Sequence, residues 1–213
     1  MNIILFGPPG AGKGTQAQKI VNKFNLYQVS TGDLLRNEII NKSDVGKKIE
    51  KIITQGDFVT DDIVNKILKT VITNPLYRSK IIFDGYPRNI TQAKNLEIML
   101  NADNQSINFI LFLKVNREII EKRILGRIIC EKCNKTFNEF LNKNEIDKHD
   151  CEKKYLIKRK DDTKDAIIYR YEEYLKKTKP VLDFYSKRSY FYEIDGEKKI
   201  DEISSKIKQI LSV

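Results

Sequence analysis

Residues 7–15 read Gly-Pro-Pro-Gly-Ala-Gly-Lys-Gly-Thr, between a short apolar run at residues 3–6 and helix-forming residues at 16–21. A strand, a glycine-rich turn and a helix, with G-x-x-x-x-G-K across the turn, is the arrangement of a phosphate-binding loop. The pattern runs here from Gly7 to Lys13, and the hydroxyl residue, Thr15, follows Gly14. The stretch therefore predicts a strand that leads, through a phosphate-binding loop, into the N-terminus of a helix.

The physical chemistry of this loop favours a bound triphosphate over an ordinary turn. Glycines let successive backbone N–H groups point inward and form a concave site for anionic oxygens. The following helix directs its positive end to the same point. Lys13 adds a full charge for the β- and γ-phosphates, and the Thr15 hydroxyl is suited to a Mg²⁺ that accompanies them.

Length and composition predict one globular core with small inserts. The chain has 213 residues, of which 40% are hydrophobic, and its apolar runs are too short to span a bilayer. Met1 leads directly into the first strand and leaves no room for a signal peptide, so we expect a cytoplasmic protein. The formal charge of +10 suits an anionic partner, but lysines occur in every segment, so this charge alone does not identify one.

Strands and helices are expected to alternate, which predicts an α/β fold with a parallel sheet covered on both faces. The expected strands lie at residues 3–6, 26–30, 81–83, 109–113 and 190–194. The expected helices begin at residue 16 and then cover 34–39, 45–54, 60–71, 89–100, 117–125, 165–185 and 200–211. Residues 30–59 and 126–162 read as inserts in a core made of residues 1–29, 60–125 and 163–213.

Polar clusters follow the first three expected strands. They are the phosphate loop, the stretch Ser30–Asp33, and the stretch Asp84–Arg88. Because ligands of parallel sheets lie at the carboxyl ends of the strands, these clusters are expected to face one crevice. Asp84 is placed to hold Mg²⁺, either directly or through water, and the Arg88 guanidinium is suited to a phosphate.

Arginine lies in or beside each of these polar loops, although lysine is far more common in the chain. Transfer of a phosphoryl group requires neutralisation of charge more than movement of protons, and the planar guanidinium pairs with phosphate in two-point geometry. The arginines expected to serve this purpose are Arg36, Arg88, Arg123, Arg127, Arg159 and Arg170.

All three cysteines fall in the second insert. Cys130 and Cys133 form a C-x-x-C pair, which is half of a zinc-binding knuckle, and Cys151 follows seventeen residues later. His149, the only histidine, and Asp150 are the alternatives for a fourth ligand, and we favour His149. The other interpretations are a decayed site closed by hydrogen bonds and a redox-active pair. The redox pair is disfavoured because the motif does not open a helix after a strand.

Taken together, these motifs resemble the adenylate kinase family over nearly the whole chain, and in particular its long-lid bacterial type, whose lid often carries structural zinc. The residues that carry the resemblance are the stretches 7–15, Ser30–Arg36, Asp84–Arg88, Arg123–Arg127 and Arg159–Asp162. Ile128 departs from the family pattern, which has a second arginine there. The resemblance implies a P-loop kinase fold with a five-stranded parallel sheet flanked by helices, an NMP-binding insert at 30–59 and a LID insert at 126–162.

The resemblance also implies a role for individual residues. Those expected at ATP are Gly10, Ala11, Gly12, Lys13, Gly14, Thr15, Arg127, Thr136, Phe137 and Lys198. Those expected at AMP are Thr31, Arg36, Asp57, Phe58, Val59, Gly85, Tyr86, Pro87, Arg88, Gln92, Arg159 and Arg170, with Gln92 at the adenine. Lys13, Arg88, Arg123, Arg159 and Arg170 would act on the transferring phosphoryl group, with Mg²⁺ near Thr15 and Asp84.

The implied reaction is reversible phosphoryl transfer from MgATP to AMP, giving two ADP, by a monomer that needs no nucleic acid or membrane partner. A kinase for UMP, CMP or GMP is the alternative within the same class. A nucleic-acid-binding protein is the alternative from another class, because basic charge accompanies a zinc-knuckle-like motif. It leaves the phosphate loop unexplained.

Overall fold

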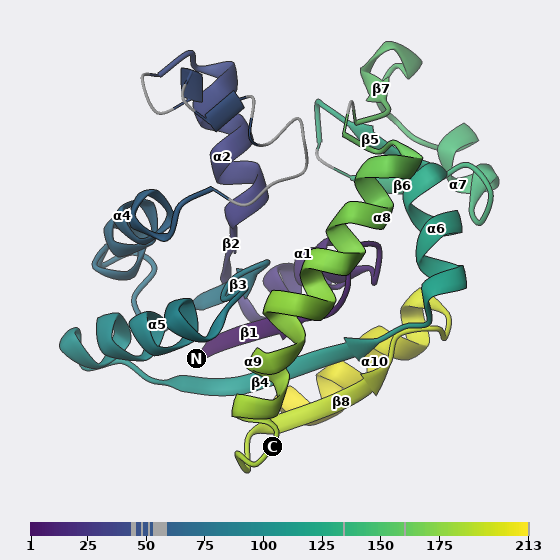
Figure 1. The fold of residues 1–213 in the computed structure, drawn as a ribbon. Coiled ribbons are helices and arrows are strands. Elements are labelled where there is room, and N and C mark those ends of the chain that lie inside the picture. The colour runs from purple at the N-terminus through teal and green to yellow at the C-terminus, as the bar shows by residue number, and fades with distance from the viewer. Residues whose placement is uncertain are drawn as a thin grey trace.

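The computed structural model describes residues 1–43, 46, 47, 49, 50, 52, 59–133, 135–159 and 161–212. Its centre is a sheet of five parallel strands, as the sequence predicts (Figure 1). In spatial order the strands are β2 (Tyr27–Ser30), β3 (Ile81–Asp84), β1 (Asn2–Phe6), β4 (Ile107–Lys114) and β8 (Phe191–Asp195). The phosphate loop therefore follows the central strand, and the polar segments after β2 and β3 emerge beside it at the same edge.

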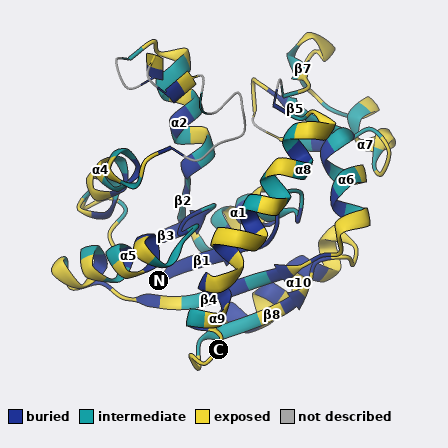
Figure 2. Cartoon of the chain, in the orientation of Figure 1, coloured by how far each residue is buried: buried dark blue, intermediate teal, exposed yellow. Residues whose placement is uncertain are grey.

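Alternation along the strands supplies two cores, one on each face of the sheet. Ile4 and Phe6 of β1 point into a core with the helices that follow β2 and β3. Ile3 and Leu5 point into the opposite core. Both faces of the central strands are therefore buried, and every residue of β1 and of its neighbour β3 is buried (Figure 2).

Helices cover both faces of the sheet. On the face of Ile4 lie α4 (Asp61–Ile72), α5 (Ile90–Ala102) and α9 (Lys179–Tyr185). On the other face lie α1 (Lys13–Phe24), α6 (Arg117–Leu125), α8 (Lys164–Glu173) and α10 (Ile200–Leu211). The helix α2 (Thr31–Ile40) rises from the end of β2 and forms part of the first insert (Figure 1).

Side chains cap the starts of three described helices, α2, α5 and α8, the last through Thr163. The Ser30 hydroxyl accepts a hydrogen bond from the Asp33 N–H at the start of α2. The Asn89 side chain accepts one from the Gln92 N–H at the start of α5. Thr60 stands at the cap position of α4, but its side chain makes no capping hydrogen bond. That start relies instead on Asp61 and Asp62 in the first turn.

The second insert contains regular structure that the sequence pattern does not indicate. Its elements are β5 (Arg127–Cys130), β6 (Thr136–Asn138), α7 (Lys143–Asp147), the short 3₁₀ turn η1 (Lys153–Tyr155) and β7 (Leu156–Ile157). The three strands form a small antiparallel sheet in the order β6-β5-β7. Strands of two to four residues are too short for a periodic pattern to be visible in the sequence.

The long helix expected at residues 165–185 is divided into three parts. The helix α8 ends at Glu173, a π-helical turn, η2, covers Tyr174–Thr178, and α9 continues to Tyr185. Pro180 lies in the first turn of α9, where its missing N–H costs little. The wider turn lets the chain continue in a helical path past this proline. The helix expected at 45–54 falls largely outside the described residues.

Ile82 on β3 is fully buried between β2 and β1, and this strand carries Asp84 to the edge where the polar clusters lie. We expect Ile82→Ala to lower the free energy of unfolding by about 2 to 5 kcal/mol, because it removes buried methylenes and leaves a cavity. Urea denaturation measures this loss. Leu76→Ala is the control, since Leu76 is 75% exposed, and it should leave stability nearly unchanged. A loss at Ile82 no larger than that at Leu76 would contradict the packing described.

Candidate active site

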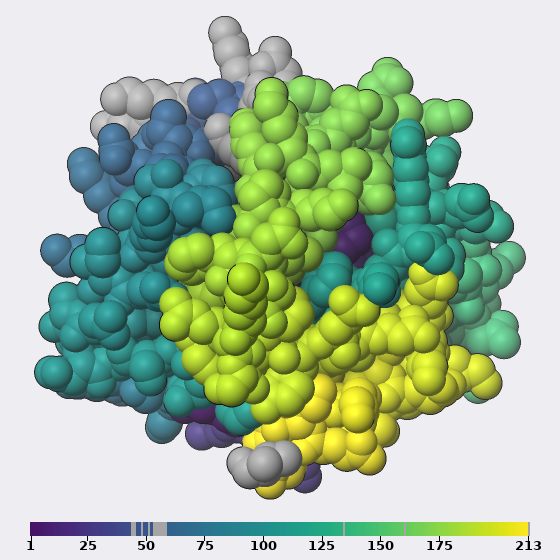
Figure 3. Space-filling model, turned by 60° about the horizontal axis from the view of Figure 1, so that its bottom comes forward, coloured from purple at the N-terminus to yellow at the C-terminus, as the bar shows by residue number. Residues whose placement is uncertain are grey.

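One large cavity, of about 980 Å³, lies at the carboxyl edge of the parallel strands. Its walls come from the phosphate loop, from α2, from the loop after β3 and from the second insert. Figure 3 shows atoms from the start of the chain, in purple, within an opening between the green and teal segments. The volume is at the upper end for small-molecule sites, which suits two nucleotides better than one.

The phosphate loop has backbone geometry that glycine permits. Gly10 and Gly12 adopt φ values of +76° and +91°, which side chains rarely adopt. A Cβ at Gly10 would also lie 2.8 Å from Ile124 Cγ1, so the loop packs directly on α6. Gly12 caps α1, whose first residue is Lys13, and the positive end of that helix therefore faces the cavity.

Lys13 is held against its own loop. Its ammonium donates to the carbonyl oxygens of Gly7 and Pro8 at 2.8 and 3.0 Å. Burial lowers the pKa of Lys13 to about 8; nearby Asp84 opposes this shift, and Arg88 and Arg127 add to it. A further anion in the cavity, beside Asp84, would stabilise the protonated form of Lys13. The charge of Lys13 therefore favours the binding of phosphate.

Asp84 ends β3 beside the start of α1. Its Oδ2 accepts a hydrogen bond from Gln28 Nε2 at 3.0 Å and lies 3.8 Å from where a Cβ on Gly14 would stand. Burial raises the pKa of Asp84, although Lys13 opposes the shift. A buried carboxylate next to a phosphate loop is an oxygen donor of the kind Mg²⁺ prefers, so the residues present fit that ion.

The loop after β3 joins the element that follows β2. Thr31 Oγ1 and Arg88 Nε both donate to the Gly85 carbonyl, at 3.0 and 2.7 Å. Gly85 has φ +78°, and a Cβ there would lie 3.2 Å from the Arg88 guanidinium. Thr178 fixes Arg88 from the other side by donating to its carbonyl oxygen at 3.0 Å. Burial, and next the charge of Arg170, lower the pKa of Arg88 to about 10.

Carboxylates hold several of the predicted arginines in place. Asp33 pairs with Arg36, and its Oδ1 lies 3.4 Å from Arg159 Nη2. Arg170 pairs with Asp161. Asp162 Oδ2 accepts from Arg127 Nε at 2.7 Å. These acids lie in the same sequence motifs as the arginines, but no local pattern indicates which acid pairs with which arginine.

Burial and the neighbouring Arg127 and Arg36 lower the pKa of Arg159 to about 10. The pKa of Asp33 is lowered in turn: burial opposes ionisation, but Arg36 and Arg159 favour it. The arrangement is thus a group of mutually repelling cations with carboxylates between them.

The wall of the cavity beside the phosphate loop and α6 contains further predicted residues. Arg123 Nη1 donates to the carbonyl oxygens of Gly196 and Ala11 at 2.9 and 3.4 Å, which ties α6 to the phosphate loop. The cavity lining also includes the other residues expected at ATP, namely Gly10, Gly14, Thr15, Arg127, Thr136, Phe137 and Lys198.

Of the residues expected at AMP, the lining also includes Thr31, Arg36, Val59, Tyr86, Pro87 and Gln92. Asp57 and Phe58 lie outside the described residues. Gln92 is buried, with 3% of its surface exposed, and shares this wall with apolar residues such as Leu35, Val59 and Val64. A flat base between apolar side chains with one amide at its edge would fit this part of the cavity.

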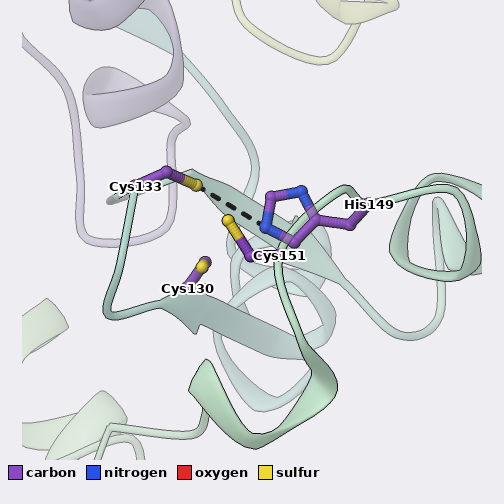
Figure 4. Close-up of side chains that lie close together, drawn as sticks. All are labelled: Cys130, Cys133, His149 and Cys151. Carbon is purple, nitrogen blue, oxygen red and sulfur yellow. Dashed lines mark hydrogen bonds between the residues drawn. The ribbon is translucent and has the colours of Figure 1, made fainter.

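A second cluster lies in the other insert, away from the sheet. The sulfur atoms of Cys130, Cys133 and Cys151 and a ring nitrogen of His149 lie within 4.8 Å of one another (Figure 4). His149 Nε2 is 3.6 Å from Cys133 Sγ. Burial opposes ionisation of Cys130, but hydrogen bonds, first from His149, lower its pKa to about 6. Three thiols and an imidazole at such spacing fit a tetrahedral Zn²⁺, and Asp150 is not in the group.

The zinc-type cluster adjoins the cavity through one aromatic ring. His149 packs edge-on against Phe137, with ring centroids 4.8 Å apart. Phe137 is buried and pairs with Ile128 across β5 and β6. Ile128, the position that departs from the family pattern, thus lies in the small sheet rather than among the arginines that line the cavity.

Among the described residues, no helix is both long enough and apolar enough to cross a membrane.

Comparison with known proteins places the chain in a family. The family model described as "Adenylate kinase" matches residues 5–190. A protein of Pelagibacter ubique named "Adenylate kinase" is 59% identical over 213 residues, which cover the whole of both chains. Proteins with the same name from Mycoplasma mycoides and Listeria monocytogenes are 41% and 36% identical, over all of this chain and at least 99% of theirs. The chain belongs to the adenylate kinase family.

Proposed function

We propose that this chain catalyses the reversible transfer of the γ-phosphoryl group of MgATP to AMP, giving two ADP. Family membership supports the reaction, and the convergence of cations in one cavity is the observation that carries the mechanism. Lys13 approaches from the phosphate loop, Arg88 from the loop after β3, and Arg159 and Arg170 from the end of the second insert and α8. Two nucleotides that repel each other need such an arrangement.

Each half of the cavity is proposed to hold one nucleotide. The triphosphate would lie in the loop Gly10–Thr15, under Arg123 and Arg127, with its base near Phe137 and Lys198. The acceptor would place its phosphate at Arg36 and Arg88 and its adenine at Gln92. The hydrogen bonds that fix Thr31 and Arg88 to Gly85 support this, because they hold the acceptor side in place before a ligand arrives.

The protein needs no nucleophile of its own in this mechanism. An oxygen of the AMP phosphate attacks in line, and Lys13, Arg88, Arg123, Arg159 and Arg170 neutralise the charge spread over the transferring group. Thr15 and Asp84 would hold Mg²⁺, which, when bound, neutralises charge on the triphosphate. Residues 30–59 and 126–162 would act as lids that exclude water, so that ATP is transferred and not hydrolysed.

The zinc-type cluster is proposed to be structural. Cys130, Cys133, His149 and Cys151 would hold Zn²⁺ and so fix the small sheet of the second insert, which has little apolar core of its own. The proposal further includes a monomer in the cytoplasm, with ATP, AMP and ADP as its only partners.

ADP formation from ATP, assayed with AMP, UMP, CMP and GMP in turn, tests the function. We expect activity with AMP to dominate.

We expect Lys13→Met and Arg88→Ala to lower kcat/KM at least about 100-fold, because each removes a charge that faces the transferring group. Lys19→Met is the matched control: it lies on α1, is partly exposed and pairs with Asp201, so its rate should stay near wild type. Variants that keep the circular dichroism of the fold and also full activity would refute the mechanism.

The lowered pKa of Lys13 gives a pH dependence with a defined sign. The free protein loses the Lys13 proton near pH 8, against an ordinary value of 10.5, whereas a bound triphosphate favours the charged form. ATP binding should therefore take up a proton above pH 8, and affinity should fall about tenfold between pH 7 and 9. Calorimetry measures both effects. AMP binding is the control and should change little, and an ATP affinity independent of pH would contradict the expectation.

Metal analysis tests the cluster and its fourth ligand. We expect about one zinc per purified chain, lost in Cys133→Ser and in His149→Asn but kept in Asp150→Asn. Loss of the metal should also lower the melting temperature, because binding energy contributes to folding of the insert. Retention of zinc by His149→Asn together with its loss from Asp150→Asn would reverse the ligand assignment.

A further inference from the structure

A side-chain amide that reads a purine must first be held in one of two orientations. The oxygen and nitrogen of a glutamine amide have nearly the same shape, and a 180° turn exchanges donor and acceptor. In one orientation the amide donates to N1 of adenine and accepts from its 6-amino group. In the other it accepts from the N1–H of a 6-oxopurine and donates to O6. An amide that turns freely would accept both bases.

Gln92 does not have this freedom, because each end of its amide meets a partner of fixed character. Its Nε2 donates to Asp61 Oδ1 at 2.6 Å, and its Oε1 accepts from the Arg88 backbone N–H at 2.7 Å. An ionised carboxylate only accepts, and a backbone N–H only donates. Turning the amide would set oxygen against oxygen and N–H against N–H in a buried place.

After these two contacts the Gln92 amide can still pair with one base. The amide nitrogen has two hydrogens and the oxygen two lone pairs, so one donor and one acceptor remain after Asp61 and Arg88 are satisfied. Adenine needs one of each. A 6-oxopurine needs one of each as well, but in exchanged places, so an amide fixed in one orientation can pair with only one of the two bases. With AMP as the proposed acceptor, that base is adenine.

Asp61 is itself fixed. The Asn89 amide nitrogen donates to both of its oxygens at 3.3 and 3.2 Å, while Asn89 Oδ1 accepts from the Gln92 N–H at 2.7 Å. Asp61 belongs to the first turn of α4 and Asn89 caps α5, so the contact spans two helices that pack together. The neighbouring Asp62 is exposed and lies in the same first turn of α4.

From this geometry we infer that Asp61 is a specificity-determining positioning residue: by locking the orientation of the Gln92 amide, it makes the acceptor site select adenine over 6-oxopurine monophosphates. The inference rests on the proposed function, in which Gln92 faces the acceptor base. The alternative is that the Asp61–Gln92 contact has a structural role and only joins α4 to α5. Removing the carboxylate would then change the stability of the protein and leave its choice of base unchanged.

The test compares AMP with IMP, which differs from it only at the edge that the amide would read. The measured quantity is the ratio of kcat/KM for IMP to that for AMP, with ATP as donor. Asp61→Asn replaces the fixed acceptor with a group that also donates, so it removes one of two constraints on the turn. The ratio should rise about tenfold, the factor that one mismatched contact of roughly 1.4 kcal/mol represents.

Asp62→Asn is the matched control, because it removes the same charge from the same helical turn without touching Gln92. It should keep the wild-type ratio, and Asp61→Ser provides a second variant should Asp61→Asn fold poorly. A ratio for both Asp61 variants within threefold of the control overturns the inference, even if they melt earlier. Failure of the proposed function is distinguishable: the wild-type protein would then form no ADP from ATP and AMP. If Gln92→Ala keeps the wild-type ratio, the amide does not read the base, and the inference is also overturned.

Discussion

Mutual repulsion between buried cations is the constraint on which this structure depends. Lys13, Arg88 and Arg159 all lose proton affinity because they are buried near other positive groups. Such a cluster is costly unless anions lie within it. Asp33, Asp161 and Asp162 supply negative charge in the protein without ligand, and phosphate oxygens are the natural addition when nucleotides arrive.

The parallel sheet brings the charged groups of the cavity together. Parallel strands deliver their following loops to one edge, so three short polar segments far apart in sequence become neighbours. The inserts then bring arginines that the sheet cannot supply. Rigid placement comes from contacts to backbone carbonyls, such as Thr31 and Arg88 on Gly85, which do not depend on a ligand.

The sequence predicts well those features of the structure that depend on neighbouring residues in the chain. The phosphate loop, the order of strands and helices, and the ends of α6 and α10 follow from motif spacing and periodicity. Contacts between distant segments were missed, because no local pattern pairs Asp33 with Arg159 or Asp61 with Gln92. The small sheet around Cys130 was missed for another reason, since its strands are too short to show a period.

The close contact between Gly10 and Ile124 has a mechanical consequence. Ile124 lies in the last turn of α6, and α6 ends where the second insert begins, at Gly126. The helix α6 therefore contacts the phosphate loop close to the end at which the second insert begins. There is no room for even a methyl group between α6 and the phosphate loop at Gly10. A tilt of α6 that accompanies motion of the insert would press on the loop backbone, so the grip on a triphosphate and the position of the insert would vary together.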